Sequence, residues 1–174
     1  MSSDRAPLAS LRVLAHPLRL RLLSLLGGAA YSAAEAAREL GETQANVSYH
    51  LRRLQQAGLV DVVEHASIRG GRAKRYRHDP TSGERLVDDD AGHLSLAMTM
   101  AGELQRRATE RKPGTPTAFT DAEFALEPAD WDRARTLARE LGILLADAAR
   151  PVGTPGTVLA AATVSLFELN EPRR

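Results

Sequence analysis

Residues 32–58 of the 174-residue chain, SAAEAARELGETQANVSYHLRRLQQAG, predict two short helices joined by a tight turn. Ser32 and Glu35 have the spacing of a capping box, in which the serine hydroxyl accepts a backbone N–H bond and the glutamate reaches back to the cap. Gly41 can adopt the left-handed conformation that ends a helix, and Thr43 can cap the next one. The stretch therefore predicts a helix, a turn and a second helix.

The second helix, expected over residues 43–57, has an apolar side and a polar side. At about 100° per residue, Val47, Leu51 and Leu54 share one side and are expected to be buried. The opposite side and its margins carry hydrogen-bonding, small or cationic groups and no carboxylate, a set suited to base edges in a major groove. The candidate DNA contacts from this helix are Gln44, Ala45, Asn46, Ser48, Tyr49, His50, Arg52 and Arg53. His50 lies at the edge of the buried side, where a hydrogen bond within the domain is an equal alternative.

A β-hairpin with a basic tip is expected next, with strands over 59–65 and 74–78 and a glycine-containing turn. Residues 69–77 carry five cations and no acid. Such a wing, over residues 66–77, would lie along the sugar-phosphate backbone or enter the minor groove, whereas the plainer alternative is a solvated hairpin. The candidate wing contacts are Arg69, Arg72, Lys74 and Arg75.

The region before the two short helices also has helical spacing. Leu8, Leu11 and Leu14 predict one short helix, and Pro17 suits the first turn of another. His16 precedes that proline and is expected to be a structural junction residue. Together with the two helices and the hairpin, these elements match the plan of a winged helix-turn-helix domain.

In order and spacing, these segments resemble ArsR-type transcriptional regulators. The segments that carry the resemblance are 14–19 (LAHPLR), 32–40 (SAAEAAREL), 47–54 (VSYHLRRL), 57–60 (AGLV) and the wing residues 71–76 (GRAKRY). The resemblance implies a homodimer on double-stranded operator DNA with two-fold character, and usually repression that an effector relieves. Residues 155–167 are similar to the tails of an enlarged subgroup from GC-rich bacteria.

The same resemblance raises the question of whether the chain has residues that could bind a metal ion. Many members sense metals through cysteine pairs on the helix that spans 32–40 here, or through His and Asp groups on the helix after the wing. This chain has no cysteine, and its later helix offers His93 alone beside nearby acids. We therefore expect neither a metal site nor a cofactor.

Charge and composition divide the chain. Residues 1–80 carry a net charge of +5 and residues 81–174 a net charge of −4. We expect a winged domain over 1–80, a linker and dimerisation helix over 81–112, and a strand-helix-strand region over 113–174 that serves dimerisation or an effector. The predicted fold class is mainly α with small β.

The helix expected after the acidic run 88–90, ending near Lys112, has a stripe with near-heptad spacing. Its alanines permit close approach of a second helix, while the alternative is that the stripe packs on its own winged domain. The candidate dimer residues are Leu8 and Leu11 of the N-terminal helix and Leu94, Ala97, Ala101, Leu104 and Ala108 of this stripe.

The last region is expected to contain strands over 119–126 and 157–169 around a helix over 128–149. One face of the second strand mixes apolar side chains with two hydroxyls, which suits a small organic ligand. The candidate ligand residues are Phe119, Phe124, Trp131, Thr163, Ser165 and Phe167. The alternative, slightly favoured, is that the region only extends the dimer core.

Several other classes of protein do not fit the sequence. The longest stretch without Asp, Glu, Lys or Arg is 17 residues, 151–167, and it opens with proline and glycine, so no membrane span is expected. We expect a cytoplasmic bacterial protein, and we find no motif of an enzyme. We expect a sequence-specific, homodimeric repressor. The alternative is a winged-helix module that binds DNA without sequence preference or binds a protein.

Overall fold

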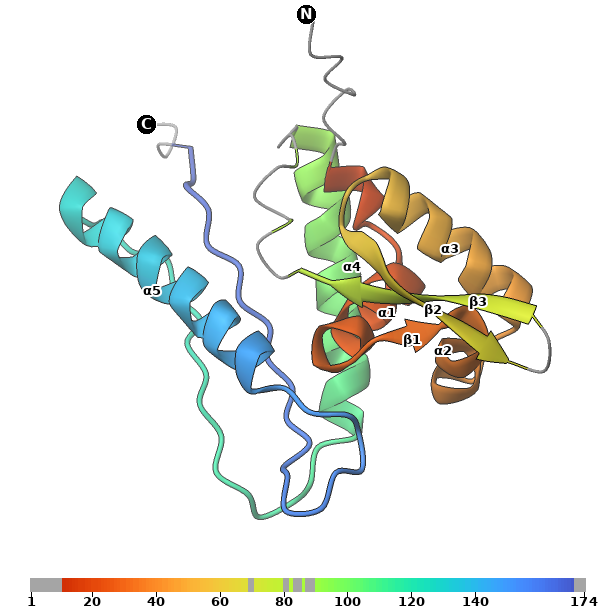
Figure 1. The fold of residues 1–174 in the computed structure, drawn as a ribbon. Helices are drawn as coiled ribbons and strands as arrows, with labels where there is room; N and C mark the ends of the chain where they lie inside the picture. Colours follow the sequence, from red (N-terminus) through yellow and green to blue (C-terminus); the bar gives the residue numbers. More distant parts are fainter. Residues whose placement is uncertain (1–10, 69–70, 80–81, 83–85, 87–89, 171–174) are drawn as a thin grey trace, which may run out of the picture.

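The computed structural model describes residues 11–68, 71–79, 82, 86 and 90–170, and for 64–68 and 71–72 it describes the backbone alone. The chain is mostly helical with one small sheet, as predicted (Figure 1). The elements, in chain order, are η1 (Leu11–Val13), α1 (Pro17–Gly28), β1 (Tyr31–Ser32), α2 (Ala33–Leu40), α3 (Gln44–Gln56), β2 (Val60–Ile68), β3 (Gly71–His78), α4 (Asp90–Thr109) and α5 (Pro128–Ala148).

Local sequence signals begin α1, α2 and α3, and end α2, at the predicted residues. Ser32 N donates to Glu35 Oε2 at 2.7 Å, and Glu35 N donates to Ser32 Oγ at 3.3 Å, which completes the capping box of α2. Gly41 ends α2 with a φ of 66°, and Thr43 Oγ1 accepts from the first turn of α3. His16 is indeed a junction residue, because its Nδ1 accepts from Leu18 N at 3.2 Å and so caps α1.

The sheet is antiparallel, in the order β1-β3-β2. Its hairpin confirms the predicted wing, although both strands extend further towards the tip than expected and Gly71 lies within β3. The two-residue strand β1 was not predicted. It forms because Tyr31 and Ser32 pair with Tyr76 and Arg75 of β3.

One apolar core holds α1, α2, α3 and the base of the sheet together. Its fully buried large side chains include Leu22 and Leu26 of α1, and Leu51 and Leu54 of α3. Because Val47 is also fully buried, all three residues predicted for the inner side of α3 are confirmed there. This burial turns the polar side of α3 outward.

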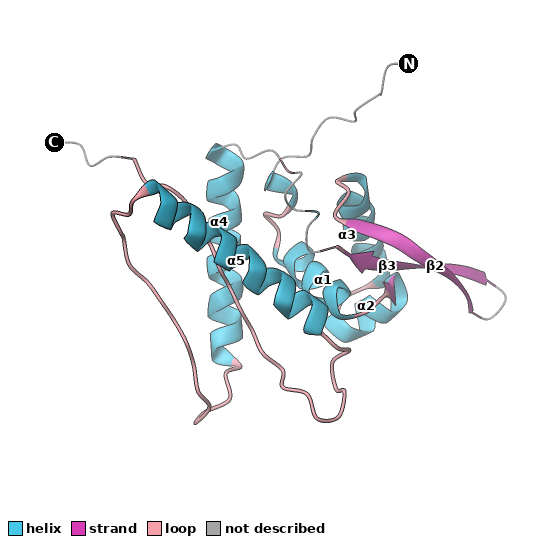
Figure 2. Cartoon of the chain, turned by 60° about the vertical axis from the view of Figure 1, so that its left-hand side comes forward, coloured by secondary structure: helices cyan, strands magenta, loops and turns pink. Residues whose placement is uncertain are grey.

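The predictions for the C-terminal region were right about the helix and wrong about the strands. Helix α5 lies within the predicted limits, but residues 119–126 and 157–169 form no strand and are drawn as loops in Figure 2. The physical reason is that an extended segment needs a neighbouring strand to accept and donate its backbone hydrogen bonds, and neither segment pairs with another. The alternating apolar pattern alone does not provide that partner.

Two helix predictions also need correction. In the described part of the helix expected around Leu8–Leu14, which starts at Leu11, the structure has the short η1, and Leu8 lies outside the described residues. Helix α4 ends at Thr109, before Lys112.

We expect truncation of the core residue Leu51 to be costly. Leu51→Ala should lower the free energy of unfolding by about 2–5 kcal/mol, because a fully buried leucine leaves a cavity behind. The matched control is Val152→Ala, whose side chain is mostly exposed and should change stability by less than about 0.5 kcal/mol. Urea unfolding followed by circular dichroism measures both. Equal small losses would show that the inner side of α3 does not hold the domain together.

Candidate nucleic-acid interface

The outer side of α3 forms a polar surface at the edge of the winged domain, next to the β2–β3 hairpin (Figure 1). Ser48 is half-buried on this surface. The predicted contact residues of α3 that are exposed are Gln44, Ala45, Asn46, Tyr49, Arg52 and Arg53. The structure thus brings seven of the eight predicted helix residues to one accessible side.

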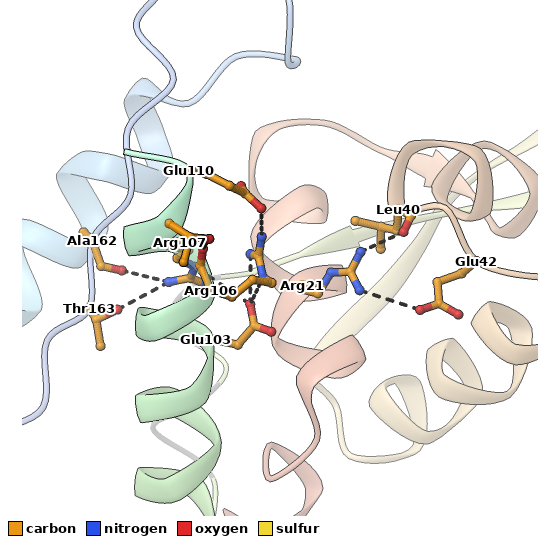
Figure 3. Close-up of polar contacts among 10 residues, drawn as sticks. Arg21, Leu40, Glu42, Glu103, Arg106, Arg107, Glu110, Ala162 and Thr163 are labelled. Carbon is orange, nitrogen blue, oxygen red and sulfur yellow. Dashed lines mark hydrogen bonds and ion pairs between the residues drawn. The ribbon is translucent and has the colours of Figure 1, made fainter. Parts of the chain in front are cut away.

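Contacts at the surface orient two of these side chains. Arg52 Nε donates to the carbonyl oxygen of Ser48 at 3.2 Å. Asn46 Nδ2 donates to Glu42 Oε2 at 3.1 Å, so a carboxylate that precedes the helix reaches the margin of the surface. Glu42 in turn pairs with Arg21 of α1 at 3.6 Å, and Arg21 also donates to the Leu40 carbonyl (Figure 3).

His50 is the exception among the predicted helix contacts and is a correction. Only 6% of its surface is exposed, and its ring stacks on that of His16 with centroids 4.3 Å apart. The residue faces α1 because it lies on the same side of α3 as Val47 and Leu54. His50 thus packs within the domain, but its Nδ1 has no hydrogen-bond partner among the described residues, so the hydrogen bond considered for it stays a prediction.

Burial governs the protonation of this histidine pair. The pKa of His16 is lowered by burial and then by the Arg19 guanidinium, against a smaller opposing effect of Glu42. The pKa of His50 is lowered by burial, by His16 and by Arg19. Both rings are therefore neutral at pH 7, which leaves His16 Nδ1 free to accept the bond that caps α1.

Arg19 of α1 is a candidate contact that the sequence analysis missed. Its pKa is lowered by burial and then by the positive charge of Arg53, which places two cations near each other beside Tyr49. Arg19 is half-buried, and Arg53 is exposed. Neighbouring cations suit a DNA phosphate. Local spacing gave no signal for Arg19, because α1 and α3 meet only in the folded domain.

The predicted wing cations have different surroundings. Lys74 is exposed on β3. Arg75 instead faces inward, where its Nη2 donates to the Ala30 carbonyl at 2.5 Å and lies 3.6 Å from Glu35. Arg75 therefore joins β3 to the start of α2, and its assignment as a wing contact stays a prediction. Arg72 lies in β3 opposite Ser67, without a described side chain, and Arg69 lies outside the described residues.

The predicted dimer stripe on α4 is exposed to solvent. Leu94 is 62% exposed and Leu104 is 53% exposed, and Ala101 and Ala108 are exposed as well, while Ala97 is half-buried. The stripe therefore does not pack on its own winged domain. Leu11 of η1 is half-buried, and η1 contacts α4.

The other side of α4 carries a charged cluster whose ion pairs lie within the helix and its C-terminal end (Figure 3). Glu103 is 5% exposed and accepts from Arg106 Nε and Nη2, each at 3.0 Å. Arg107 reaches the C-terminal segment, where it donates to the Ala162 carbonyl at 3.2 Å and to Thr163 Oγ1 at 3.4 Å. Residues 157–170, named the C-terminal arm below, are thereby attached to α4.

The six predicted ligand residues do not line one pocket. Trp131 Nε1 donates to Glu168 at 2.7 Å, and the Phe167 ring contacts His93 with centroids 5.2 Å apart. Thr163 contacts Arg107, whereas Phe119, Phe124 and Ser165 are exposed. A groove of about 460 Å³ between α5 and the arm is lined by other residues, among them Arg135, Leu141, Leu145, Val164 and Leu166.

No helix in the described part of the chain is long and apolar enough to cross a membrane. Within the same residues, no three His, Cys, Asp or Glu side chains are grouped so that they could hold a metal ion.

The lowered pKa values predict a pH dependence of stability. Because the folded state disfavours protonated His16 and His50, the unfolded chain binds more protons below about pH 6.5, and stability should fall on acidification from about pH 7.5 to pH 5.5. His16→Asn keeps a capping acceptor and removes one titrating ring, so the fall in Tm should be smaller. It should not vanish, because burial also lowers the pKa of His78. An unchanged fall in the variant would contradict this role of His16.

Comparison with known proteins agrees with the architecture of the first third of the chain. Residues 14–63 match the family model of a helix-turn-helix domain. A search of solved structures finds similarity to the crystal structure of Rv0081 from M. tuberculosis, with 25% identity, 56% of this chain and 87% of that chain covered, and a TM-score of 0.36. No curated protein matches the chain. Residues 14–63 therefore form a helix-turn-helix domain, which indicates a DNA-binding regulator of transcription.

Proposed function

We propose that this protein is a homodimeric, sequence-specific transcriptional repressor of the ArsR type, which acts by binding DNA and not as an enzyme. The observation that carries the proposal is the exposed polar side of α3 beside the hairpin. Its inner side is fully buried at Val47, Leu51 and Leu54, so α3 is rigidly held with its polar groups outward. A helix presented in this way fits the major groove of B-DNA.

Different residues supply recognition and attachment in this proposal. Gln44, Asn46 and Ser48 have the hydrogen-bonding groups that contact base edges. Lys74 on the wing, Arg53 of α3 and the neighbouring Arg19 of α1 supply positive charge for phosphates. Binding through these cations releases counterions, so affinity should fall as salt rises.

The exposed stripe on α4 supports the proposed homodimer. One recognition helix contacts few base pairs, and a two-fold dimer places a second one about one helical turn away on the operator. Leu94 and Leu104 are large apolar side chains that a second copy would cover. Relief of repression by a small organic effector, bound beyond residue 113, belongs to the same proposal, with a purely structural role of that region as the alternative.

Lys74→Ala and Gln44→Ala should have different effects on DNA binding. Lys74→Ala should weaken binding to all duplexes and lower the salt slope by about one counterion, since one phosphate contact is lost. Gln44→Ala should change the preference among sequences, by about 1–3 kcal/mol if a bidentate base contact is lost. Arg75→Ala is the matched control on β3, because its inward contacts predict lower stability instead.

Gel shifts at several salt concentrations measure these effects, with labelled upstream promoter DNA and unlabelled random DNA as competitor. Specific recognition predicts that random DNA competes poorly. Equal competition by random DNA would favour a module that binds without sequence preference, and absence of any shift would favour one that binds a protein.

A further inference from the structure

Helix α5 carries an apolar stripe that the single chain leaves largely uncovered. Its positions alternate by three and four residues, which is the spacing of a coiled-coil seam. Leu137 is 55% exposed and Leu144 is 63% exposed, and none of the residues of this fully described helix is buried. The stripe consists of Ala134, Leu137, Leu141, Leu144 and Ala148.

The C-terminal arm covers only one edge of this stripe. Ala138, Leu141 and Leu145 line the groove that α5 shares with arm residues Ala162 and Val164. At about 100° per residue, Leu137 and Leu144 lie on the edge away from this groove. A stripe of coiled-coil spacing with its outer leucines in water needs a second helix for burial.

The charged residues beside the stripe favour one orientation of a partner helix over the other. Arg133, Glu140 and Asp147 are exposed and follow one edge at seven-residue spacing, with the cation at the first turn and the acids later. In a parallel pair of α5 helices, this charged edge would face the apolar edge with Ala138 and Leu145. In an antiparallel pair, the charged edges meet, so Arg133 lies near Asp147 of the partner subunit, twice over by symmetry, while Glu140 lies near Glu140 of the partner subunit at the centre. The two opposite-charge pairs outnumber the one like-charge pair.

The place of α5 in the fold allows such a partner. In Figure 1, α5 lies on the side of the molecule opposite the β2–β3 hairpin. A second copy bound there leaves the polar side of α3 accessible.

We propose that α5 packs antiparallel against α5 of a second copy of this chain, with Leu137, Leu141 and Leu144 in the seam and Arg133 paired with Asp147 of the partner subunit. This interface is additional to the α4 stripe and deepens the homodimer proposed above. If the α4 pair and the α5 pair share one two-fold axis, both interfaces belong to the same dimer. If each pair has its own two-fold axis, the two interfaces together build a tetramer.

The natural absence of cysteine makes a direct test possible with the full-length chain. A single Leu141→Cys substitution, near the centre of the seam, should give a disulfide-linked dimer as the main species under mild oxidation. Thr136→Cys lies on the opposite side of the same exposed helix and should remain monomeric on a denaturing gel. Ala101→Cys on α4 tests the proposed dimer independently.

Orientation and charge have separate tests. With a short bifunctional maleimide, a mixture of Ala134→Cys and Ala148→Cys chains should cross-link to each other, and neither should cross-link to itself. In the Leu141→Cys background, Arg133→Glu should reduce the cross-linked fraction, and adding Asp147→Arg should restore it.

The outcomes distinguish the two proposals. Cross-linking through Ala101→Cys but not Leu141→Cys, in a chain with unchanged circular dichroism, would overturn the α5 interface and leave the homodimer standing. Failure of both, with a monomeric mass by light scattering, would overturn both. Equal cross-linking of Leu141→Cys and Thr136→Cys would show random collision, and self-cross-linking of Ala134→Cys would contradict the antiparallel arrangement.

Discussion

Burial of Val47, Leu51 and Leu54 against the first two helices is the constraint on which the rest of the domain depends. These side chains are fully buried, and they fix both the position of α3 and its rotation about its own axis. Because the helix cannot rotate without exposing leucine, Gln44, Asn46 and Tyr49 stay outward. The polar surface that we assign to DNA is thus a direct consequence of packing on the other side of the same helix.

Features that depend on neighbours in sequence could be predicted without the structure. The capping box at Ser32, the left-handed Gly41 and the Thr43 cap each involve groups within a few residues, so spacing alone is sufficient to identify them. The amphipathic pattern of α3 likewise predicted its buried side. The same pattern could not show whether the His50 side chain is buried, because its burial depends on ring contact with His16, the residue that caps α1.

The missed features all depend on contacts between distant segments. Strand β1 exists through its pairing with β3, and Arg75 faces inward because the Ala30 carbonyl and Glu35 lie beside it. The expected C-terminal strands are absent from residues 119–126 and 157–169, because neither segment lies beside another strand with which it could pair in the single chain. Apolar residues on α4 and α5 are left uncovered in the single chain, and we propose that a second copy covers them.

In the proposed dimer, two copies of α3 recognise a defined sequence together. Selection from a pool of random-sequence duplexes, with the full-length protein immobilised and several rounds of amplification, tests this recognition. We expect an enriched inverted repeat whose half-site centres lie about 34–36 Å apart, or a multiple of this distance. Recovery of bound duplexes with no shared sequence would contradict specific recognition, and enrichment of a single half-site would contradict recognition by a two-fold pair.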